Sequence, residues 1–360
     1  MKMKIILPLF ISIIILTISC NNDAVIPPDE EPTTGVFDFI RGVDISFLPE
    51  IETTSTVFKN SDNEQKGVLT IVKEAGCNTV RIRLWHNPIT IHSSFGEVKT
   101  LAERVRNAGL KVWLCVHYSD TWADPGNQEV PAAWNGLDLA TLKDSVTNYT
   151  IRIVTEIQPD FIQIGNEINN GFMWTNGQWN PDFHELLKVG CQAVRNTSDS
   201  CQIMIHHAGI SGVSTFFDNI TNNSIDYDLI GISYYPIWHG KDLDALSNTM
   251  KSLKSNYNKK VIIAETAYPF TFDWKDWTNN IIGDDSQTLN EYPATPNGQR
   301  DFLRKIKEIS TDEDNFGFCY WGTEWVAFRG DQATNGSTWE NQALFDFNNK
   351  AVPAMEVLGE

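Results

Sequence analysis

The sequence has little positive charge. It contains 28 lysines and arginines against 46 aspartates and glutamates, which gives a formal net charge of −18 at pH 7. A protein that binds nucleic acid needs a basic surface to meet the phosphates, so we expect no nucleic-acid partner. A polyanionic substrate is disfavoured for the same reason. A neutral ligand fits this charge balance best.

Motifs for transition metals are also missing, because the chain has neither a CxxC pair nor an HExxH sequence. We therefore expect that no cofactor is required. Five cysteines follow Cys20, and three of them lie in or beside apolar runs, so most are predicted to be small core residues. A disulfide between Cys191 and Cys201 is compatible with the sequence but not required by it.

Long hydrophobic runs are absent after the N-terminus. Two lysines precede an apolar run at residues 5–18, which is too short for a typical membrane span. Residues 1–19 are therefore predicted to be an export signal. The sequence LTISC at 16–20 is typical of a bacterial lipoprotein processing site, which would leave a lipid on Cys20. An ordinary signal peptide with a chance cysteine is the alternative.

The segment after this cysteine is polar, acidic and proline-containing. Residues 20–36 are therefore predicted to be a solvated tether. We expect an exported monomer that is held at the cell envelope only through the lipid on Cys20. The periplasm and the outer-membrane surface both remain open as locations.

From residue 37 to residue 360, apolar strand-like segments alternate with amphipathic helix-like segments. Strands are expected at 39–46, 78–85, 110–117, 161–164, 202–206, 229–235, 260–265 and 316–321, with helices at 65–75, 98–108, 139–156, 183–196, 213–220, 243–253 and 298–309. Eight such units predict a single α/β domain, a (β/α)8 TIM barrel over residues 37–360. A doubly wound sheet, the alternative, would need fewer strands or a domain boundary, and no linker is visible.

Polar and aromatic residues stand at the carboxyl ends of these strands. In a barrel such residues gather at one rim, where catalytic sites form. In chain order they are Asp44; Arg81, Arg83 and Trp85; His117 and Asp120; Asn166 and Glu167; His206 or His207; Tyr234 and Tyr235; Glu265; and Trp321. Any one of them could be structural, but their number at strand ends predicts a functional site.

Two glutamates, Glu167 and Glu265, end the fourth and seventh strands. A carboxylate at the end of a buried strand is costly to ionise, so the pKa of Glu167 should rise, as suits a general acid. Glu265 could be kept ionised by Arg81 or Arg83 and a tyrosine hydroxyl, which would lower its pKa. Glycoside hydrolysis needs one such acid and one such carboxylate. A structural Glu–Arg pair is the alternative for either residue alone.

The 12 tryptophans are many for this length, and flat indole faces suit the apolar faces of sugar rings. Trp113 lies inside an apolar strand and is predicted to be core. Trp122 and Trp134 lie in the long third loop, where cleft lining and surface packing are both open. Trp174 and Trp179 flank the loop after Glu167 in a polar setting, which favours stacking on a sugar.

Six segments together resemble glycoside hydrolase family 53, the endo-β-1,4-galactanases that act on type I arabinogalactan. They are GVDIS at 42–46, RIRLWHNP at 81–88, HYSDTWADPG at 117–126, QIGNE at 163–167, GISYYPIWHG at 231–240 and ETAYP at 265–269. They follow the family order, and the resemblance runs from about residue 37 to the C-terminus.

The resemblance implies a retaining endo-acting hydrolase of β-1,4-galactosidic bonds in galactan, with Glu167 as acid/base and Glu265 as nucleophile. Asn166 would bind the 2-hydroxyl of the reacting sugar, and Trp321 would stack beneath the substrate. The other residues that would contact substrate are Asp44, Arg83, His117, Asp124, His206, Tyr234, Tyr235 and Trp238.

Two segments depart from the family pattern. Residues 320–325 read YWGTEW where the family more often has WEPAW, so Glu324 is unusually placed and the local subsites are uncertain. Residues 270–297 lack a clear match to the calcium-binding loop of some bacterial members. Asp273, Asp276, Asp284 and Asp285 could ligate Ca²⁺ through oxygen atoms, but an acidic solvated loop is the favoured interpretation.

Two other functions stay open on the sequence alone. One is a surface lipoprotein that captures glycans without cleaving them, against which the presence of both glutamates argues. The other is a retaining barrel glycosidase for a different β-1,4-glycan, such as mannan or glucan, because related barrels share the arrangement of two glutamates.

Overall fold

A computed structural model describes residues 39–174, 180–312 and 315–360. The predicted export signal, the tether, the lipid site at Cys20 and Trp179 lie outside these residues. Phe37–Glu360 forms one compact unit. Within the described part of the chain, no helix combines the length and apolar character needed to cross a membrane.

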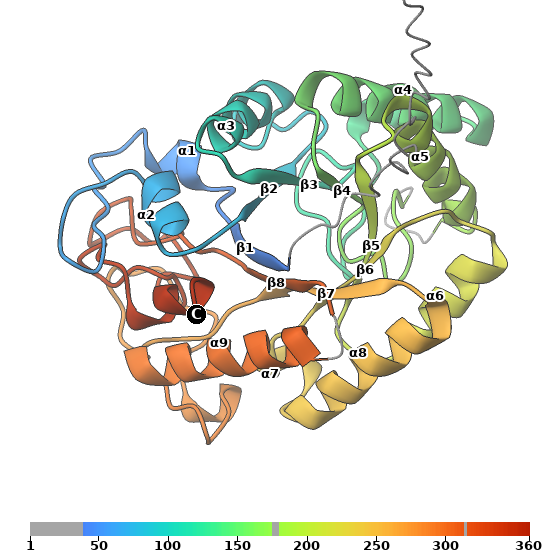
Figure 1. Ribbon diagram of the computed structural model, residues 1–360. Coiled ribbons are helices and arrows are strands. Elements are labelled where there is room, and N and C mark those ends of the chain that lie inside the picture. The colour runs from blue at the N-terminus through green and yellow to red at the C-terminus, as the bar shows by residue number, and fades with distance from the viewer. Residues whose placement is uncertain (1–38, 175–179, 313–314) are drawn as a thin grey trace, which may run out of the picture. The chain divides into compact units, whose positions relative to one another are not determined.

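Eight parallel strands close into a barrel in chain order (Figure 1). They are β1 Ile40–Asp44, β2 Thr79–Leu84, β3 Lys111–Val116, β4 Phe161–Ile164, β5 Gln202–Ala208, β6 Leu229–Ser233, β7 Lys260–Thr266 and β8 Gly317–Tyr320. Pairing of β8 with β1, in which Gly317 lies opposite Ile40, completes the ring. The predicted single (β/α)8 barrel is confirmed, and every predicted strand is present.

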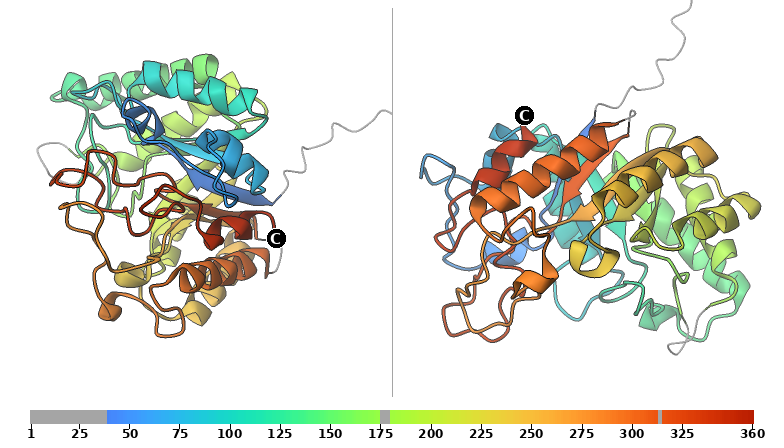
Figure 2. Two further views of the ribbon diagram at one scale, coloured as in Figure 1. Left: turned by 90° about the vertical axis from the view of Figure 1, so that its left-hand side faces the viewer. Right: turned by 90° about the horizontal axis from the view of Figure 1, so that it is seen from below.

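Helices cover the outside of the barrel, as Figures 1 and 2 show. The helices in the described part of the chain are α1 Leu48–Ile51, α2 Val68–Glu74, α3 Phe95–Asn107, α4 Leu139–Ile157, α5 Phe183–Thr197, α6 Val213–Asn222, α7 Pro236–His239, α8 Leu243–Tyr257 and α9 Pro296–Thr311, with 3₁₀ helices η1 Ala132–Trp134, η2 Asp285–Gln287 and η4 Pro353–Leu358. The short α7 lies at the barrel mouth, where Trp238 and His239 line a cavity. Neither α1 nor α7 was predicted, because four residues are too few to show a helical period. After β8, η4 packs against α9, where Lys307 Nζ donates to the carbonyl oxygen of Val357 at 2.8 Å.

The barrel interior has an apolar floor with a polar layer above it. The floor consists of Ile40, Trp113, Phe161, Met204, Leu229, Ile262, Ala264, Phe316 and Cys319. Trp113 is fully buried, which confirms its predicted place in the core, and its Nε1 donates to Gln163 Oε1 at 3.2 Å. Gln163 also accepts from Arg81 Nε at 3.3 Å, so the first charged side chain of the interior rests directly on this floor.

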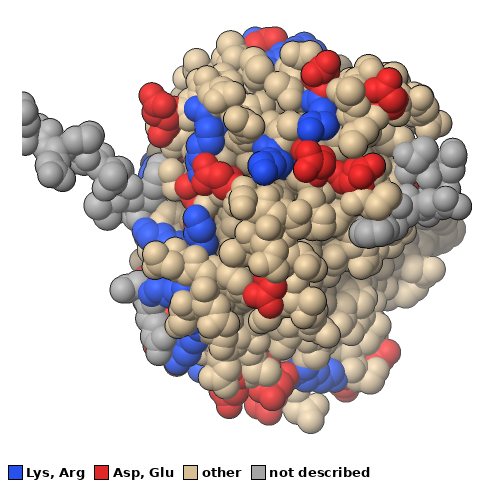
Figure 3. Space-filling view, turned by 90° about the vertical axis from the view of Figure 1, so that its right-hand side faces the viewer, with Lys and Arg blue, Asp and Glu red and all other residues tan. Residues whose placement is uncertain are grey.

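The described cysteines are buried and free, so Cys191 and Cys201 form no disulfide. On the face shown in Figure 3, acidic and basic side chains are interspersed. Several acidic and basic side chains of the described residues form ion pairs with one another. For example, Arg195 binds both Asp226 and Asp228 at 2.8 Å. Such exposed pairs contribute little to stability, so the core and the barrel hydrogen bonds must hold the fold.

Replacing Gly317 with alanine should destabilise the barrel at its closing seam. Gly317 has a φ of 135°, and a Cβ there would lie 2.2 Å from the carbonyl oxygen of Ile40 on β1. We expect the free energy of unfolding to fall by about 3 kcal/mol or more, measured by urea titration. Gly96→Ala is the control, because this position in α3 faces open space and alanine should stabilise it by up to about 1 kcal/mol. Equal stability of both variants would contradict this account of the seam.

Candidate active site

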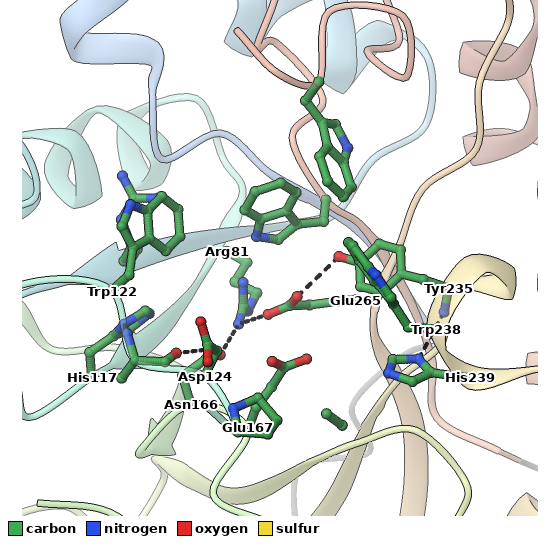
Figure 4. A pocket seen from close by; sticks show the side chains of 16 residues that line it. Arg81, His117, Trp122, Asp124, Asn166, Glu167, Tyr235, Trp238, His239 and Glu265 are labelled. Carbon is green, nitrogen blue, oxygen red and sulfur yellow. Dashed lines mark hydrogen bonds and ion pairs between the residues drawn. The ribbon is translucent and has the colours of Figure 1, made fainter. Parts of the chain in front are cut away.

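A cavity of about 380 Å³ opens at the carboxyl end of the barrel. Its wall consists of Arg81, Arg83, His117, Trp122, Ala123, Asp124, Pro125, Asn166, Glu167, Ala208, Tyr235, Trp238, His239, Glu265, Trp321 and Trp339. Figure 4 shows these side chains converging from different strands on one space. Nine of the twelve predicted catalytic and binding residues are on this wall, and the exceptions are Asp44, His206 and Tyr234.

Glu167 and Glu265 meet across this cavity. One carboxylate oxygen of each, together with a ring nitrogen of His206, all lie within 4.8 Å of one another. Glu167 follows the end of β4, where Gly165 and Glu167 have φ values of 82° and 47°. Non-glycine residues rarely adopt this left-handed conformation, and the local backbone strain is what turns the Glu167 side chain into the cavity.

Glu265 is held by two donors. Arg81 Nη2 donates to Oε1 at 2.6 Å, and the Tyr235 hydroxyl donates to Oε2 at 3.0 Å. Burial raises the pKa of Glu265, and Arg81 and Tyr235 oppose that rise without reversing it. This differs from the lowered pKa expected from the sequence, because nearly complete burial outweighs one cation that is shared with a second carboxylate.

Arg81 is that shared cation. Its Nη1 donates to Asp44 Oδ2 at 2.7 Å, and its Nη2 also donates to Asn166 Oδ1 at 2.9 Å. Either Arg81 or Arg83 was predicted to be the partner of Glu265, but only Arg83 was predicted to contact the substrate. The guanidinium of Arg83 instead lies 4.0 Å from the ring centre of Trp122, with its Nε bonded to Ser93.

Glu167 has a different environment from Glu265. Its only hydrogen-bond donor to the carboxylate, within the described residues, is the Ser233 hydroxyl, which lies 2.5 Å from Oε1. Burial, followed by repulsion from Glu265, raises the pKa of Glu167 to about 8. Glu167 is therefore protonated near neutral pH, as the sequence predicted for an acid, whereas the negative charge of the pair belongs beside Arg81 on Glu265.

Aromatic rings form one side of the cavity. Trp122, Trp321, Trp339 and Trp238 follow one another with ring centres 6.1, 4.8 and 6.1 Å apart. Trp238 is 53% exposed and stands at the rim. Trp339 was missed because it lies in a long loop without periodicity. Of the two tryptophans left open, Trp122 lines the cavity and Trp134 does not. Trp174, for which stacking on a sugar was favoured, is not on the cavity wall either.

The three predicted residues that are off the cavity wall have other contacts. Asp44 lies beneath the cavity and binds Arg81 and the Ser46 hydroxyl. The hydroxyl of Tyr234 donates to the carbonyl oxygen of Gly240 at 2.7 Å, so only its neighbour Tyr235 reaches the site. His206 is fully buried behind Glu167. His207 does not face solvent, because it packs against Phe216.

Of the departing segment at residues 320–325, Trp321 is on the cavity wall but Glu324 is not. Glu324 is fully buried, accepts from the backbone N–H of Phe47 at 2.8 Å, and has a pKa raised by burial. It therefore supports the ring of Phe47, which stacks on Trp325 at 3.9 Å, and it does not line the cavity.

The four calcium candidates do not form a common site. Asp276 is buried and accepts from the N–H of Thr278, whereas Asp284 caps η2 by accepting from Ser286. Within the described ranges, the one cluster of at least three His, Cys, Asp or Glu ligand atoms is Glu167, His206 and Glu265. The Arg81 cation already neutralises that cluster in part.

Comparison with known proteins gives consistent matches over almost the whole chain. The model of glycosyl hydrolase family 53 matches residues 40–358. The sequence is 33% identical over 348 residues to an arabinogalactan endo-beta-1,4-galactanase of Cellvibrio japonicus, covering 89% of this chain and 91% of that protein. It is 30% identical to an endo-beta-1,4-galactanase of Bacillus subtilis, with 89% and 85% coverage. The GH53 catalytic domain of Ignisphaera aggregans superposes with a TM-score of 0.83 and 35% identity, covering 91% of this chain and 98% of that one.

Replacing Arg81 with methionine should destabilise the protein more at neutral than at acid pH. The change leaves Glu265 buried without its cation, which costs about 3–5 kcal/mol. The pKa of Glu265 in the folded variant would then lie even further above its unfolded value, so stability would be regained as the pH falls and the carboxyl group takes up a proton. Urea titrations at pH 5 and pH 7 measure this difference. Arg83→Met is the control, because Arg83 forms no ion pair within the described residues; the same pH dependence in both variants would refute the assignment.

Proposed function

The chain belongs to glycosyl hydrolase family 53, as its motifs suggested, and from this premise we propose that it is an endo-β-1,4-galactanase. Its substrate would be galactan or type I arabinogalactan, which it would cleave with retention of configuration. The observation that carries the proposal is the pair of carboxyl groups with unlike surroundings, Glu167 with a raised pKa and Glu265 bound to a cation, facing each other across one cavity.

The separation of the two carboxyl groups supports retention. Retaining enzymes hold the pair about 5–5.5 Å apart, whereas inverting enzymes leave about 6.5–9.5 Å for a water molecule between carboxylate and sugar. Oxygens of Glu167 and Glu265 within 4.8 Å of each other leave no such space. A covalent glycosyl-enzyme intermediate is the route that fits this distance.

On this route Glu265 attacks the anomeric carbon while Glu167 gives its proton to the leaving glycosidic oxygen. Arg81 and Tyr235 occupy one lone pair of each Glu265 oxygen and fix the carboxylate in place. In the second half of the reaction Glu167, now ionised, takes a proton from the water that releases the sugar. The same residue therefore serves as acid and then as base.

The remainder of the cavity suits a neutral sugar chain. The tryptophans offer flat apolar faces, and Asn166, His117 and Asp124 supply polar atoms to the same cavity. Burial lowers the pKa of His117, so this side chain brings no charge at neutral pH. No observation favours a lipoprotein that captures glycans without cleaving them, because such a function would not explain the paired carboxyl groups.

A panel of galactan, mannan and β-glucan tests which polysaccharide is cleaved, and cleavage of galactan alone is expected.

Export, lipid attachment at Cys20 and a monomeric state remain part of this proposal. Export and lipid attachment rest on the N-terminal sequence and not on contacts, because residues 1–38 lie outside the described part of the chain. No cofactor is proposed for the reaction, since the two glutamates supply both the acid and the nucleophile.

Substituting each glutamate with glutamine should separate their roles. Glu167→Gln should lower kcat/KM on galactan by about 10²–10⁴-fold, since general acid catalysis contributes that much. The same variant should retain most of its kcat/KM on a dinitrophenyl β-galactoside, whose leaving group needs no proton. Glu265→Gln should lose both activities, because no nucleophile remains. Reducing-sugar and dinitrophenol release measure the two reactions.

Circular dichroism and thermal unfolding serve as controls for the two variants, which should remain folded. Loss of dinitrophenol release in Glu167→Gln, or near wild-type cleavage of galactan by either variant, would contradict the assigned roles.

The pH dependence of galactan cleavage should have a basic limb near pH 8. Glu167 must carry a proton to act as acid, and its pKa is raised to about 8, so kcat/KM should fall as the pH rises through that value. With the dinitrophenyl glycoside this limb should weaken or vanish. Initial rates from pH 5 to pH 10 on both substrates provide the measurement, and an identical limb on both would argue against Glu167 as its source.

A further inference from the structure

We infer that Ser233 is a positioning residue for Glu167, because it determines which carboxyl oxygen of this acid carries the transferable proton. The inference rests on the proposed function and adds a residue that the sequence motifs did not single out for a role. It follows from a hydrogen-bonded chain that runs from the barrel floor to Glu167, in which each donor and acceptor can be assigned.

The hydrogen-bonded chain begins at Gln163, whose amide orientation is fixed by its neighbours. Its Oε1 faces Trp113 Nε1 at 3.2 Å and Arg81 Nε at 3.3 Å, and both of these groups can only donate. The oxygen must therefore be on that side. The Nε2 group consequently points the other way, 2.7 Å from His206 Nδ1, where it donates.

The tautomer of His206 follows from this donor. Its Nδ1 faces Gln163 Nε2 at 2.7 Å and the backbone N–H of Glu167 at 3.3 Å, so Nδ1 must accept. A third contact, of 3.2 Å to Asn166 Oδ1, would favour a proton on Nδ1, but that proton would collide with both donors. Burial, followed by the Arg81 charge, lowers the pKa of His206 and keeps the ring neutral. Its single proton is therefore on Nε2.

Ser233 is the next link. His206 Nε2 lies 2.9 Å from Ser233 Oγ and donates to it. The serine is fully buried, and the other hydrogen-bond partner of its hydroxyl, within the described residues, is Glu167 Oε1 at 2.5 Å. Its hydroxyl proton has no other acceptor, so it must be donated to Oε1. This oxygen cannot then hold the proton of the acid.

The acid proton is therefore on Glu167 Oε2. This oxygen makes no hydrogen bond to any described residue, and Glu167 is partly exposed to the cavity. In the first step the Oε2–H bond breaks and the proton moves to the glycosidic oxygen. The bond between this oxygen and the anomeric carbon breaks as well, and the oxygen keeps its electron pair. In the second step Oε2 takes a proton from water. Ser233 donates to Oε1 throughout and stabilises the anion between the two steps.

The barrel register explains how a small residue reaches this place. Along β6 and β7, Ile232 lies opposite Ile263, but Ser233 lies opposite Glu265, so one extra residue is inserted on β7. This irregularity brings the Ser233 hydroxyl level with both carboxyl groups. Such insertions re-aim side chains beside active sites.

The test compares Ser233→Ala with Thr266→Val. Thr266 supplies an equally buried hydroxyl, one residue from Glu265, that has no hydrogen-bond partner within the described residues. With Ser233→Ala, kcat on galactan should fall by about 10- to 100-fold, because the acid loses its fixed orientation. Its kcat/KM on the dinitrophenyl β-galactoside should change by less than about threefold, since that leaving group needs no acid. Thr266→Val should resemble wild type on both substrates.

The pH profile gives the second readout. A donor to a carboxylate favours its charged form, so removing Ser233 should raise the pKa of Glu167 and move the basic limb of galactan cleavage to higher pH. A merely structural serine would lower both activities together and leave this limb unmoved. That outcome, or wild-type behaviour of Ser233→Ala on galactan, overturns the inference.

A measurement without substrate separates this inference from the proposed function. Titration of ¹³C-labelled glutamate carboxyl groups by NMR, with Glu167 assigned through Glu167→Gln, should show a higher pKa for Glu167 in Ser233→Ala than in wild type. If galactan is not cleaved by the wild-type protein, the proposed function fails, and this titration still decides the contact. An unchanged pKa of Glu167 refutes the role of Ser233.

Discussion

The buried ion pair between Arg81 and Glu265 is the constraint on which the rest of the site depends. Arg81 is 1% exposed and also binds Asp44, so one buried cation faces two buried carboxylates. A third charge on Glu167 would have no partner there. The cost of burying an unpaired charge forces Glu167 to keep its proton. The two glutamates therefore differ in their protonation because both are buried and Arg81 binds only one of them.

The barrel supplies this constraint through its register. Arg81 and Gln163 come from β2 and β4 at one level, directly above the apolar floor formed by Trp113 and its neighbours. Glu167 and Glu265 lie one layer higher, each at an irregular point: a left-handed backbone after β4 and an inserted residue in β7. Regular strands would alternate their side chains and could not place all of these groups in one cavity. Local departures from regular geometry thus build the site on a regular frame.

Much of this was predictable from the sequence, for identifiable reasons. Apolar runs located the eight strands, and polar residues at their ends located the cavity. The position of a side chain along the barrel axis was not predictable. Arg81 and Arg83 share a strand face, and only their positions along that axis decide which one contacts Glu265. Tyr234 and Tyr235 differ by one residue, so a slip in register decides which hydroxyl reaches the site. Ser233 lies within the GISYYPIWHG segment, but its role could not be predicted, because it depends on the tautomer of His206, which only contacts can assign.

The same electrostatic coupling accounts for the change of role that the proposed reaction demands of Glu167. Repulsion from Glu265 is the second cause of its raised pKa, after burial. When Glu265 forms an ester with the sugar, it loses its charge, and this repulsion disappears. The pKa of Glu167 should then fall, so that the residue that has just acted as an acid remains ionised and can act as a base.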